Sequence, residues 1–430
     1  MPKKILKNCS VLDVVEQRIM ENQSILIDGK YIKCIGPVDE LSSCEKGISE
    51  EFVYDLNGRT VIPGLIDSHI HLCAIQAPIG EIPVELDTVL ENLRASETLR
   101  ILYAAKNAKE TLEAGFTTVK DVGSAGDNLA LRDGIEKGLI AGPRIVACGW
   151  VTQTGGQGEL LSSEWVYNVP LREPDVGVDG PWEIRKKVRK LVGQGYDYIK
   201  VFSTGGGYLH HPWHPYWGDR RNFTIEELKA LVDEAHAAGR RVAGHAMANV
   251  EGIKNAIKAG VDTLEHGIFL DDNDVGEMKR KNIGFIPTMA VFERMWDYEN
   301  PEAMPYVHIE KEQAERYLDA HQASFQRAYK AGIKISAGSD TLRVLKHGEN
   351  AAEIVALVKA GMSEMEALAS ATIHGADALG VGHLVGSINE GKFADLIVVD
   401  PNPLNDISVL CNRENLKMII KNGDLIISNL

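Results

Sequence analysis

The chain has 430 residues, 44% of them hydrophobic and 25% charged, which is enough for a large core and a smaller companion domain. Its 61 acidic and 46 basic side chains give a formal charge of −15, which disfavours nonspecific binding to nucleic acid or to an anionic membrane. The sequence contains no signal-like start and no apolar run long enough to span a membrane, so we expect a cytoplasmic protein. The six cysteines form no C-x-x-C pair, and free thiols are expected.

The two ends of the chain carry short strand patterns separated by turns. Near the start, 24–28 and 31–35 flank Gly29-Lys30, and near the end 394–400 and 424–427 have the same texture. We therefore expect residues 1–62 and 381–430 to form one β-sandwich domain together.

Residues 63–380 alternate between strand-like and helix-like segments. The eight strand candidates are 65–71, 117–122, 144–150, 198–203, 241–247, 262–267, 284–291 and 333–340. Capping-box patterns at Thr224 and Ser363 predict helix starts, and the Ala-Gly pairs at 114–115, 238–239, 259–260 and 331–332 predict helix ends. Eight β-α units predict an α/β fold, a (β/α)8 TIM barrel, whose active site lies at the C-terminal ends of the strands.

The first strand candidate ends in two histidines, His69 and His71. Alternate side chains of a strand share a face, so both imidazoles point the same way, as a metal ion requires. The alternative is a partly buried strand with two hydrogen-bonded histidines. The other strand ends must decide between these interpretations.

Four further strands carry a metal-binding type of side chain at or near their ends: Lys200, His245, His266 and Asp340. Lys200 stands in an otherwise apolar strand, where an ammonium needs an ion pair. The alternative to an ion-paired ammonium is that Lys200 forms a carbamate with carbon dioxide. The carbamate would be an anionic oxygen donor. Each histidine alone could be a satisfied buried side chain, and Asp340 alone could be a helix cap. Their joint position at the barrel strand ends predicts a metal site.

These segments resemble the amidohydrolase superfamily, from Pro63-Gly-Leu-Ile-Asp-Ser-His-Ile-His71 to Glu390-Gly-Lys-Phe-Ala-Asp395. The segments 199–207, 223–228, 260–267 and 347–350 are similar to its prolidase-like, Xaa-Pro dipeptidase branch. The resemblance implies a binuclear metal centre in which His69, His71 and Asp340 hold one ion and His245 and His266 hold the other. Carboxylated Lys200 and a hydroxide would bridge the ions, and Asp340 would carry a proton to the departing amine.

The resemblance also implies a metal-dependent amidohydrolase that cleaves an amide-type carbon–nitrogen bond. Zinc is the expected metal, and manganese, cobalt or iron would suit the same ligands. The substrate would be a small molecule, such as a dipeptide-like, N-acyl, aryl amide, carbamate or urea compound. We expect no nucleic-acid or membrane partner, and the family suggests a homo-oligomer.

Departures from the branch affect the substrate more than the mechanism. Met247 and Gln157 stand where the family pattern has histidines, and an aromatic and histidine-rich loop spans Tyr208–Trp217. Its aromatic rings would either line the pocket or cover the barrel rim. His347 and Arg343 are further candidates for substrate binding. Met247, Gln157 and the aromatic loop together favour a bulky apolar or aromatic group beside the scissile bond.

Two other classes of function remain open. One is a deaminase or cyclic-amide hydrolase with a single metal, similar to the imidazolonepropionase branch, from which Lys200 would distinguish this chain. The other is a noncatalytic scaffold that has lost its ligands, which the presence of all six expected metal-site residues disfavours.

Overall fold

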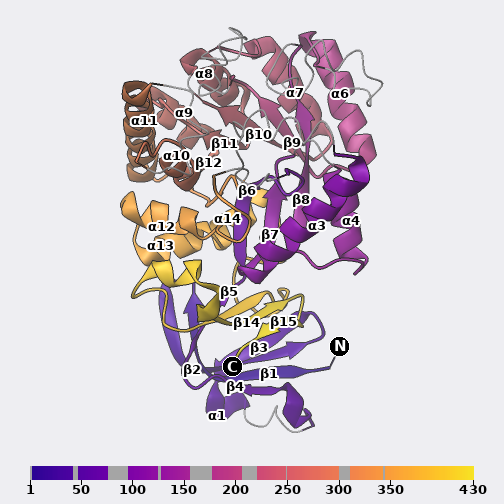
Figure 1. Ribbon diagram of the computed structural model, residues 1–430, viewed down its shortest axis with the longest axis vertical. Coiled ribbons are helices and arrows are strands. Elements are labelled where there is room, and N and C mark those ends of the chain that lie inside the picture. Colours follow the sequence, from indigo (N-terminus) through magenta and orange to yellow (C-terminus); the bar gives the residue numbers. More distant parts are fainter. Residues whose placement is uncertain are drawn as a thin grey trace.

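The computed structural model describes residues 2–41, 47–75, 95–123, 127–154, 177–205, 220–247, 249–299, 310–341 and 344–430. They form a helix-covered parallel barrel and a separate sheet at one end of the molecule, which also carries both termini (Figure 1). The predicted α/β fold class is confirmed. Among the described residues, no helix is long and apolar enough to cross a membrane.

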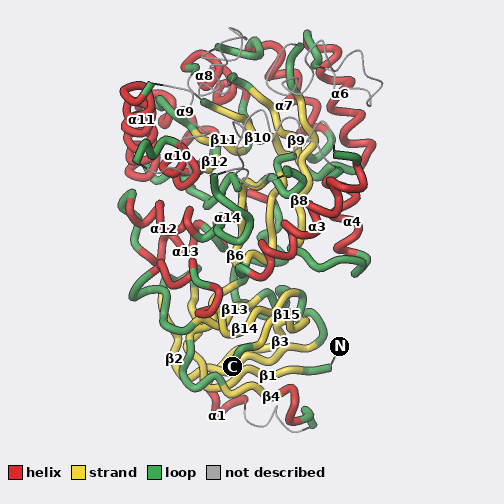
Figure 2. Tube along the Cα trace, viewed as in Figure 1, coloured by secondary structure: helices red, strands yellow, loops and turns green. Residues whose placement is uncertain are grey.

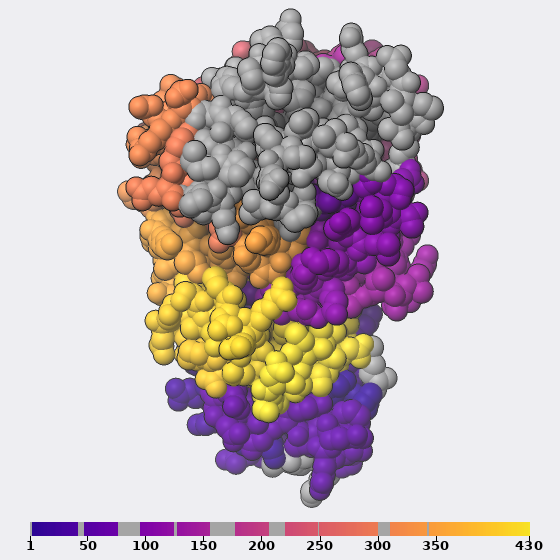
Figure 3. Space-filling view, viewed as in Figure 1, coloured from indigo at the N-terminus to yellow at the C-terminus, as the bar shows by residue number. Residues whose placement is uncertain are grey.

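The end sheet combines strands from both ends of the chain in the order β15-β14-β13-β5-β1-β2-β3, and β4 also pairs with β1. Residues of the two ends adjoin on the surface as well, indigo beside yellow (Figure 3). Its strands are β1 (Lys4–Asp13), β2 (Arg18–Asp28), β3 (Tyr31–Pro37), β4 (Val53–Asp55), β5 (Thr60–Pro63), β13 (Leu396–Val399), β14 (Leu416–Lys421) and β15 (Asp424–Ser428). Short helical segments border them: α1 (Val38–Leu41), η2 (Glu50–Phe52), η5 (Ile407–Cys411) and η6 (Arg413–Asn415).

This sheet folds back on itself around one apolar core. The β3 edge meets the segment before β13, where the amide of Ala394 donates to the carbonyl of Lys30 over 2.8 Å. Leu6 and Ile25 from the N-terminal strands share their core with Leu396 and Met418 from the C-terminal strands. Neither end of the chain could bury this surface alone, so the two ends fold as one unit.

The barrel sheet is parallel, in the order β12-β11-β10-β9-β8-β7-β6, with its strands inside a layer of helices (Figure 2). The strands are β6 (Leu65–Ile70), β7 (Phe116–Asp121), β8 (Arg144–Val151), β9 (Tyr198–Phe202), β10 (Arg241–Ala246), β11 (Thr263–His266) and β12 (Gly284–Ile286). The helices are α3 (Glu97–Glu113), α4 (Asn128–Glu136), α6 (Gly180–Gln194), α7 (Ile225–Ala237), α8 (Val250–Ala259), α9 (Asp272–Lys281), α10 (Met289–Met295), α11 (Lys311–Lys330), α12 (Ala352–Lys359), α13 (Glu364–Ser370) and α14 (Ile373–Leu379).

The predicted helix boundaries are confirmed where the sequence carries strong end signals. Thr224 and Ser363 each form the reciprocal capping box with a glutamate three residues later. The glycines of the four Ala-Gly pairs adopt left-handed backbone angles just past α3, α7, α8 and α11.

The eighth predicted strand, 333–340, closes the barrel without forming a regular strand. Its backbone hydrogen bonds go to two different strands. The Ser336 amide donates to the carbonyl of Phe285 of β12, and the Ser68 amide of β6 donates to the Ala337 carbonyl. The Ala337 amide is directed to Ser370 instead, so only an isolated bridge joins Ile335 to Phe285. The expectation of a full strand here is therefore wrong, although the segment does occupy the eighth position.

The seventh strand is shorter than the predicted 284–291. It ends at Ile286, and the left-handed Thr288, with φ of 55°, turns the chain away from the sheet. The amides of Met289 and Ala290 then donate to the two carboxylate oxygens of Glu353, over 3.0 and 2.8 Å, and α10 begins. A carboxylate from α12 thus converts the predicted end of a strand into the start of a helix.

Candidate metal centre

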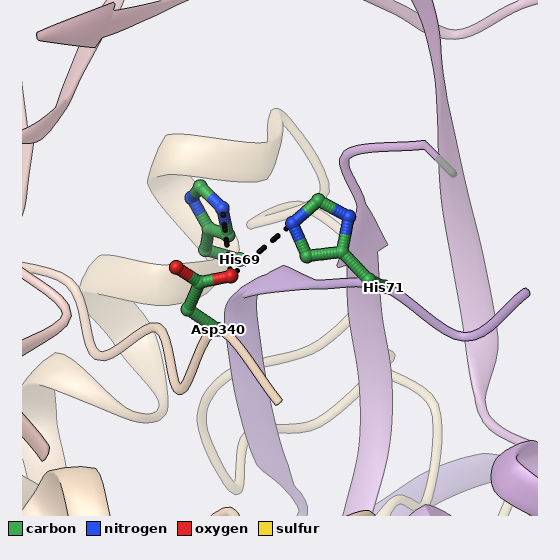
Figure 4. Close-up of side chains that lie close together, drawn as sticks. All are labelled: His69, His71 and Asp340. Atoms are coloured by element: carbon green, nitrogen blue, oxygen red, sulfur yellow. Dashed lines mark ion pairs between the residues drawn. The ribbon is translucent and has the colours of Figure 1, made fainter. Parts of the chain in front are cut away.

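Three of the predicted ligands meet at the C-terminal end of the barrel. His69 is the last residue but one of β6, His71 directly follows the strand, and Asp340 lies on the closing segment beside them. One ligand atom from each lies within 4.8 Å of the others, with Asp340 Oδ1 at 3.1 Å from His71 Nε2 and 3.6 Å from His69 Nε2. The two imidazoles and the carboxylate point toward one another (Figure 4).

The backbone of the closing segment holds Asp340 in this position. Its amide donates to the carbonyl of His69 over 2.8 Å, and its φ of 51° lies in the left-handed region that costs a non-glycine residue energy. A side chain at Gly338 would come within 2.8 Å of the His69 Cβ, so only glycine permits this close approach.

Asp67, buried on β6, ties the same two segments together. Its Oδ1 accepts from the amides of His69 at 3.1 Å and Ser339 at 3.0 Å. Its Oδ2 accepts from the Ser339 hydroxyl and, over 2.7 Å, from the amide side chain of Asn350. Burial raises the pKa of Asp67, and the four donors offset this only in part. The same four bonds fix the spacing between His69 and Asp340.

His245 and His266 form a second group beside the first. His245 Nδ1 lies 3.1 Å from His266 Nε2, and the His266 ring centre is also 5.0 Å from that of His69. The side chains of Glu265 and His266 would normally face opposite sides of β11. The left-handed backbone of His266, with φ of 68°, breaks this alternation at the strand end. The four imidazoles therefore form one continuous arc.

Hydrogen bonds around two rings assign the nitrogen that is free to bind a metal. The Thr288 hydroxyl donates to the Pro287 carbonyl at 2.6 Å, so its oxygen must accept from His266 Nδ1 at 2.8 Å. Likewise, His71 Nδ1 faces the carbonyl of Gly123, which can only accept. In their neutral form both rings thus carry their proton on Nδ1 and offer the lone pair of Nε2.

The donor set fits a divalent cation. Within the described part of the chain, the buried atoms His69 Nδ1, His245 Nε2 and Asp340 Oδ1 have no hydrogen-bond partner in suitable geometry, even where another polar atom is near. Buried polar atoms are rarely left in this state unless a ligand or water satisfies them. Imidazole nitrogens and carboxylate oxygens are the ligands that zinc and similar metals accept.

The electrostatics keep most of these histidines neutral. Burial, followed by the Lys200 charge, places the pKa of His69 and of His245 well below the usual value. Burial and neighbouring imidazoles do the same to the pKa of His266. Burial opposes ionisation of Asp340, but the facing His69, His71 and Lys200 outweigh it, and its pKa is lowered. Burial also opposes protonation of His71, but the hydrogen bond to Asp340 and the charge of that carboxylate outweigh burial, and the pKa of His71 is raised. The site therefore presents three neutral imidazoles, an ionised carboxylate and one histidine, His71, whose protonated form is favoured by that carboxylate.

Lys200 lies on β9, fully buried, and its ammonium contacts Oε2 of Glu265 on β11. Burial and the nearby Lys120 lower the pKa of Lys200 to about 7, so its uncharged amine is well populated near neutral pH. His69 Nδ1 is 3.2 Å from the same Glu265 oxygen. Glu265 therefore links Lys200 to the first group of ligands.

Glu265 and Lys120 were missed as site residues from sequence. Lys120 is fully buried on β7, with its Nζ 2.8 Å from Glu265 Oε1. The available signal was weaker than for Lys200: a lysine inside a predicted strand, 117–122, that also contains threonine and aspartate. Glu353, which fixes the turn at Thr288, had no comparable local signal because its role depends on α10.

The predicted substrate residues have different outcomes. Met247 follows β10, is 1% exposed, and belongs to an apolar cluster with Phe292, Trp296 and Tyr317. Phe292 contacts the His266 ring at 5.5 Å between centres and stacks on Trp296, so this cluster, residues 247, 268, 291, 292, 295, 296, 314 and 317, reaches the metal centre. We call it the apolar wall.

His347 lies on the other side of the site. It is buried, with Nδ1 at 3.3 Å from the Thr341 hydroxyl, and burial lowers its pKa to about 3. Gln157, Tyr208 and Arg343, together with the loop 208–217, lie outside the described residues.

Comparisons with known proteins agree with this geometry. A sequence model of the amidohydrolase family matches residues 60–426. Ochratoxinase from Aspergillus niger is 29% identical over 425 residues, covering 94% of this chain and 83% of that protein. Imidazolonepropionase from Geobacillus sp. (strain WCH70) is 22% identical over 441 residues, covering 96% and 92%. A crystal structure of a Xaa-Pro dipeptidase with bound methionine in the active site has a TM-score of 0.83 and 34% identity, covering 99% of this chain and all (100%) of that one.

Proposed function

The chain belongs to the amidohydrolase family, as a prolidase-like hydrolase acting on carbon–nitrogen bonds, and from this premise we propose a binuclear metal-dependent enzyme that cleaves an amide-type bond in a small molecule. The observation that carries the proposal is the convergence of four imidazoles and Asp340 at the barrel's C-terminal end, with donor atoms that lack protein partners among the described residues.

His69, His71 and Asp340 would hold one cation, and His245 and His266 the other, with Lys200 between them. Such cations supply Lewis-acid polarisation of the scissile carbonyl and lower the pKa of a water molecule. The Thr288 and Gly123 oxygens would keep His266 and His71 in the tautomer that binds metal.

Asp340 would transfer the proton from the attacking water to the departing amine. Its lowered pKa keeps the carboxylate ionised, so it can accept a proton from the attacking water at one of its oxygens. The same carboxyl group would then protonate the nitrogen of the departing amine as the carbon–nitrogen bond breaks. The proton is returned, and Asp340 is a carboxylate again at the end of the cycle.

Lys200 would serve as a carbamate. The lone pair of its uncharged amine forms a bond to the carbon of carbon dioxide, one carbon–oxygen electron pair moves to oxygen, and the nitrogen loses a proton to solvent. The product is an anion with two oxygen donors, which suits a position between two cations. The lowered pKa of Lys200 supports this step, because only the uncharged amine has the lone pair.

The apolar wall supports a substrate with a bulky apolar or aromatic group beside the scissile bond. Phe292 places apolar surface directly against the His266 ring, and Met247 belongs to the same buried cluster. Apolar groups gain from burial against such a surface, whereas the charged ends of a small dipeptide need polar partners. The methionine in the active site of the similar Xaa-Pro dipeptidase is likewise an apolar amino acid.

A substrate panel combined with metal analysis tests the proposal. The purified protein should contain about two divalent ions per chain, and removing them should abolish hydrolysis in a way that zinc, manganese or cobalt restores. Aryl amides, N-acyl amino acids with apolar side chains, carbamates and ureas should exceed Gly-Pro in kcat/KM. One ion per chain with full activity would refute the binuclear centre and favour the single-metal cyclic-amide alternative. A preference for small polar dipeptides would refute the role given to the apolar wall.

Ordinary Xaa-Pro dipeptidase activity is the second candidate, favoured by the 34% identity to a protein of that name. In that case a basic side chain would have to hold the substrate carboxylate. The same panel separates the two candidates. If the protein is an Xaa-Pro dipeptidase, Xaa-Pro dipeptides with a bulky apolar first residue should have the highest kcat/KM. If the first candidate is right, aryl amides, carbamates and ureas should have the highest kcat/KM.

A further inference from the structure

A tryptophan on β8, Trp150, stands beside the metal centre and has no role in it so far. It is the last residue but one of the strand and pairs with Lys200 of β9. A side chain at the preceding Gly149 would meet Leu191 of α6, so Gly149 faces the helix layer and Trp150 faces the barrel interior. The indole is only partly buried, whereas residues 145–149 of the same strand are buried. The ring therefore lies at the C-terminal end of the barrel, where the ligands are.

The indole N–H of Trp150 takes the place of a backbone hydrogen bond between β7 and β8. The paired residues of these two strands end at Asp121 and Ala147. Just beyond this point, the carbonyl of Val122 accepts from Trp150 Nε1. A buried carbonyl needs a donor, and here a side chain supplies it where the strand pairing has stopped. The segment after β7 is therefore held by the side chain of Trp150.

This segment, Val122 and Gly123, contacts the end of β6 at two points. The amide of Val122 donates to the carbonyl of Ile70 over 2.9 Å, and the carbonyl of Gly123 accepts from Nδ1 of His71. Because a carbonyl can only accept, this bond orients the His71 ring whether the imidazole is neutral or charged. Gly123 has a φ of 93°, and any side chain there would overlap the Trp150 indole. The indole thus lies directly against the turn that orients His71.

The ring of Trp150 supports the second group of ligands. It meets Phe202, the last residue of β9, edge to face, with 5.3 Å between the ring centres and 90° between the ring planes. The Phe202 ring centre in turn lies 5.4 Å from that of His245. Aromatic pairs in such arrangements attract each other beyond the effect of burial alone. Trp150 therefore contacts both groups through one intermediate each, the turn on one side and Phe202 on the other.

We infer that Trp150 is a positioning residue shared by both halves of the metal centre: its N–H holds the turn that orients His71, and its ring holds Phe202 against His245. The inference rests on the proposed binuclear centre. It assigns the two halves to different parts of one side chain, so each contribution can be removed separately. A tryptophan that only fills space would affect both halves together.

The first variant removes the N–H alone. Benzothienylalanine placed at position 150 keeps both fused rings and replaces only the N–H by sulfur, so the fold loses no volume. Zinc binding is measured by competition with a chelator and resolved into two steps. The step of the ion assigned to His69, His71 and Asp340 should weaken by about tenfold, and the other step should stay close to its unaltered value.

The second variant, Phe202→Leu, removes the other contact and leaves the indole N–H in place. It should weaken the step of the ion assigned to His245 and His266 by roughly two- to tenfold, the loss expected for one aromatic pair, and spare the first step. Phe116→Leu is the matched control, because Phe116 is a buried ring at the opposite end of β7. Both steps should be unchanged in the control.

A measurement on metal-free protein tests the hold on the turn without any metal. In protein labelled with nitrogen-15 histidine, the Nδ1 proton of His71 should give a slowly exchanging NMR resonance, which benzothienylalanine at position 150 should shift into fast exchange. The Nδ1 proton of His266, held by Thr288, is the internal reference and should persist. Spectra of His71→Asn and His266→Asn assign the two resonances.

The outcomes separate this inference from the proposed function. If the His71 resonance or the first zinc step is unchanged without the N–H, Trp150 does not hold the turn. If Phe202→Leu leaves the second step unchanged, or if either variant weakens both steps equally, the division of roles is overturned. Failure of the unaltered protein to bind two zinc ions would instead overturn the proposed centre, whatever the His71 resonance shows.

Discussion

Replacing Thr288 with valine would test whether a hydroxyl behind the metal centre controls metal binding. Valine has the same shape and is also β-branched, so the left-handed backbone at this position should be no more strained than before. The change removes the acceptor 2.8 Å from His266 Nδ1 and the donor to the Pro287 carbonyl. It leaves the ligands themselves in place.

The expected magnitude follows from burial. His266 and Thr288 are both buried, at 2% and 0% exposed, so the Nδ1 proton loses its partner without gaining water. An unsatisfied buried donor costs about 1–3 kcal/mol. The ring can avoid this cost by moving its proton to Nε2, which is the atom needed for metal. Metal affinity should therefore fall by roughly 10–100-fold, or about 1.4–2.7 kcal/mol.

The assay is competition between metal-free protein and a chromophoric chelator for zinc, resolved into two binding steps. Thr288→Val should weaken one step, that of the ion held by His245 and His266, and leave the other close to the unaltered value. Thr111→Val is the control, because its buried hydroxyl faces His347, which is not a proposed ligand. Two unchanged steps in Thr288→Val would refute the tautomer argument, and equal weakening of both would refute the division of ligands between two ions.

Three further predictions use other parts of the site. Asp340→Asn should retain much of its metal, because an amide oxygen still coordinates, yet lose about two orders of magnitude or more in kcat; near-normal turnover would remove Asp340 from proton transfer. Lys200→Ala should lose metal and recover part of it with a short carboxylic acid, and a free amine at Lys200 in fully active protein would contradict the carbamate. His347 has a pKa lowered to about 3 by burial, so it stays neutral in the fold while the unfolded chain takes up a proton below pH about 6.5. The neutral His347 should therefore lower the free energy of unfolding of the metal-free protein by about 1.4 kcal/mol for each unit that the pH falls below about 6.5. In His347→Asn the urea midpoint should fall less steeply as the pH is lowered; the same steepness in both proteins would show that His347 is not neutral in the fold.

Much of the site could be predicted because its ligands follow local rules. His69 and His71 share a face through simple strand alternation, and Lys200 stood out as a charge among apolar neighbours. Helix ends at Gly115 and Gly260 were equally local, since a glycine after an alanine can take the left-handed angle that stops a helix. Patterns of this kind depend on a few consecutive residues, so no tertiary contact is needed to interpret them.

The end of the seventh strand shows where such rules stop. Residues 284–291 form one predicted strand, yet the strand ends at Ile286, just before Pro287. Glu353, far along the chain, then accepts hydrogen bonds from the amides of Met289 and Ala290 at the start of a helix. The closing segment, 333–340, likewise has a strand-like sequence whose backbone bonds are shared among three partners. Pro287 is a local signal for the end of the seventh strand. The helix that follows and the divided hydrogen bonds of the closing segment have no signal within the segments themselves.

The sequence alone therefore determined the alternation of strands and helices, the barrel, and the residue types that gather at its C-terminal end, because periodicity and strand direction are local properties. Only the tertiary structure decided which of these side chains touch. Lys120 and Glu265 are 145 positions apart, on strands that are not neighbours in the sheet, and they meet because the barrel curves β7 and β11 toward a common interior. The contacts around Asp340 depend in the same way on how closely the eighth segment approaches β6, a distance set by barrel closure and by the missing side chain at Gly338.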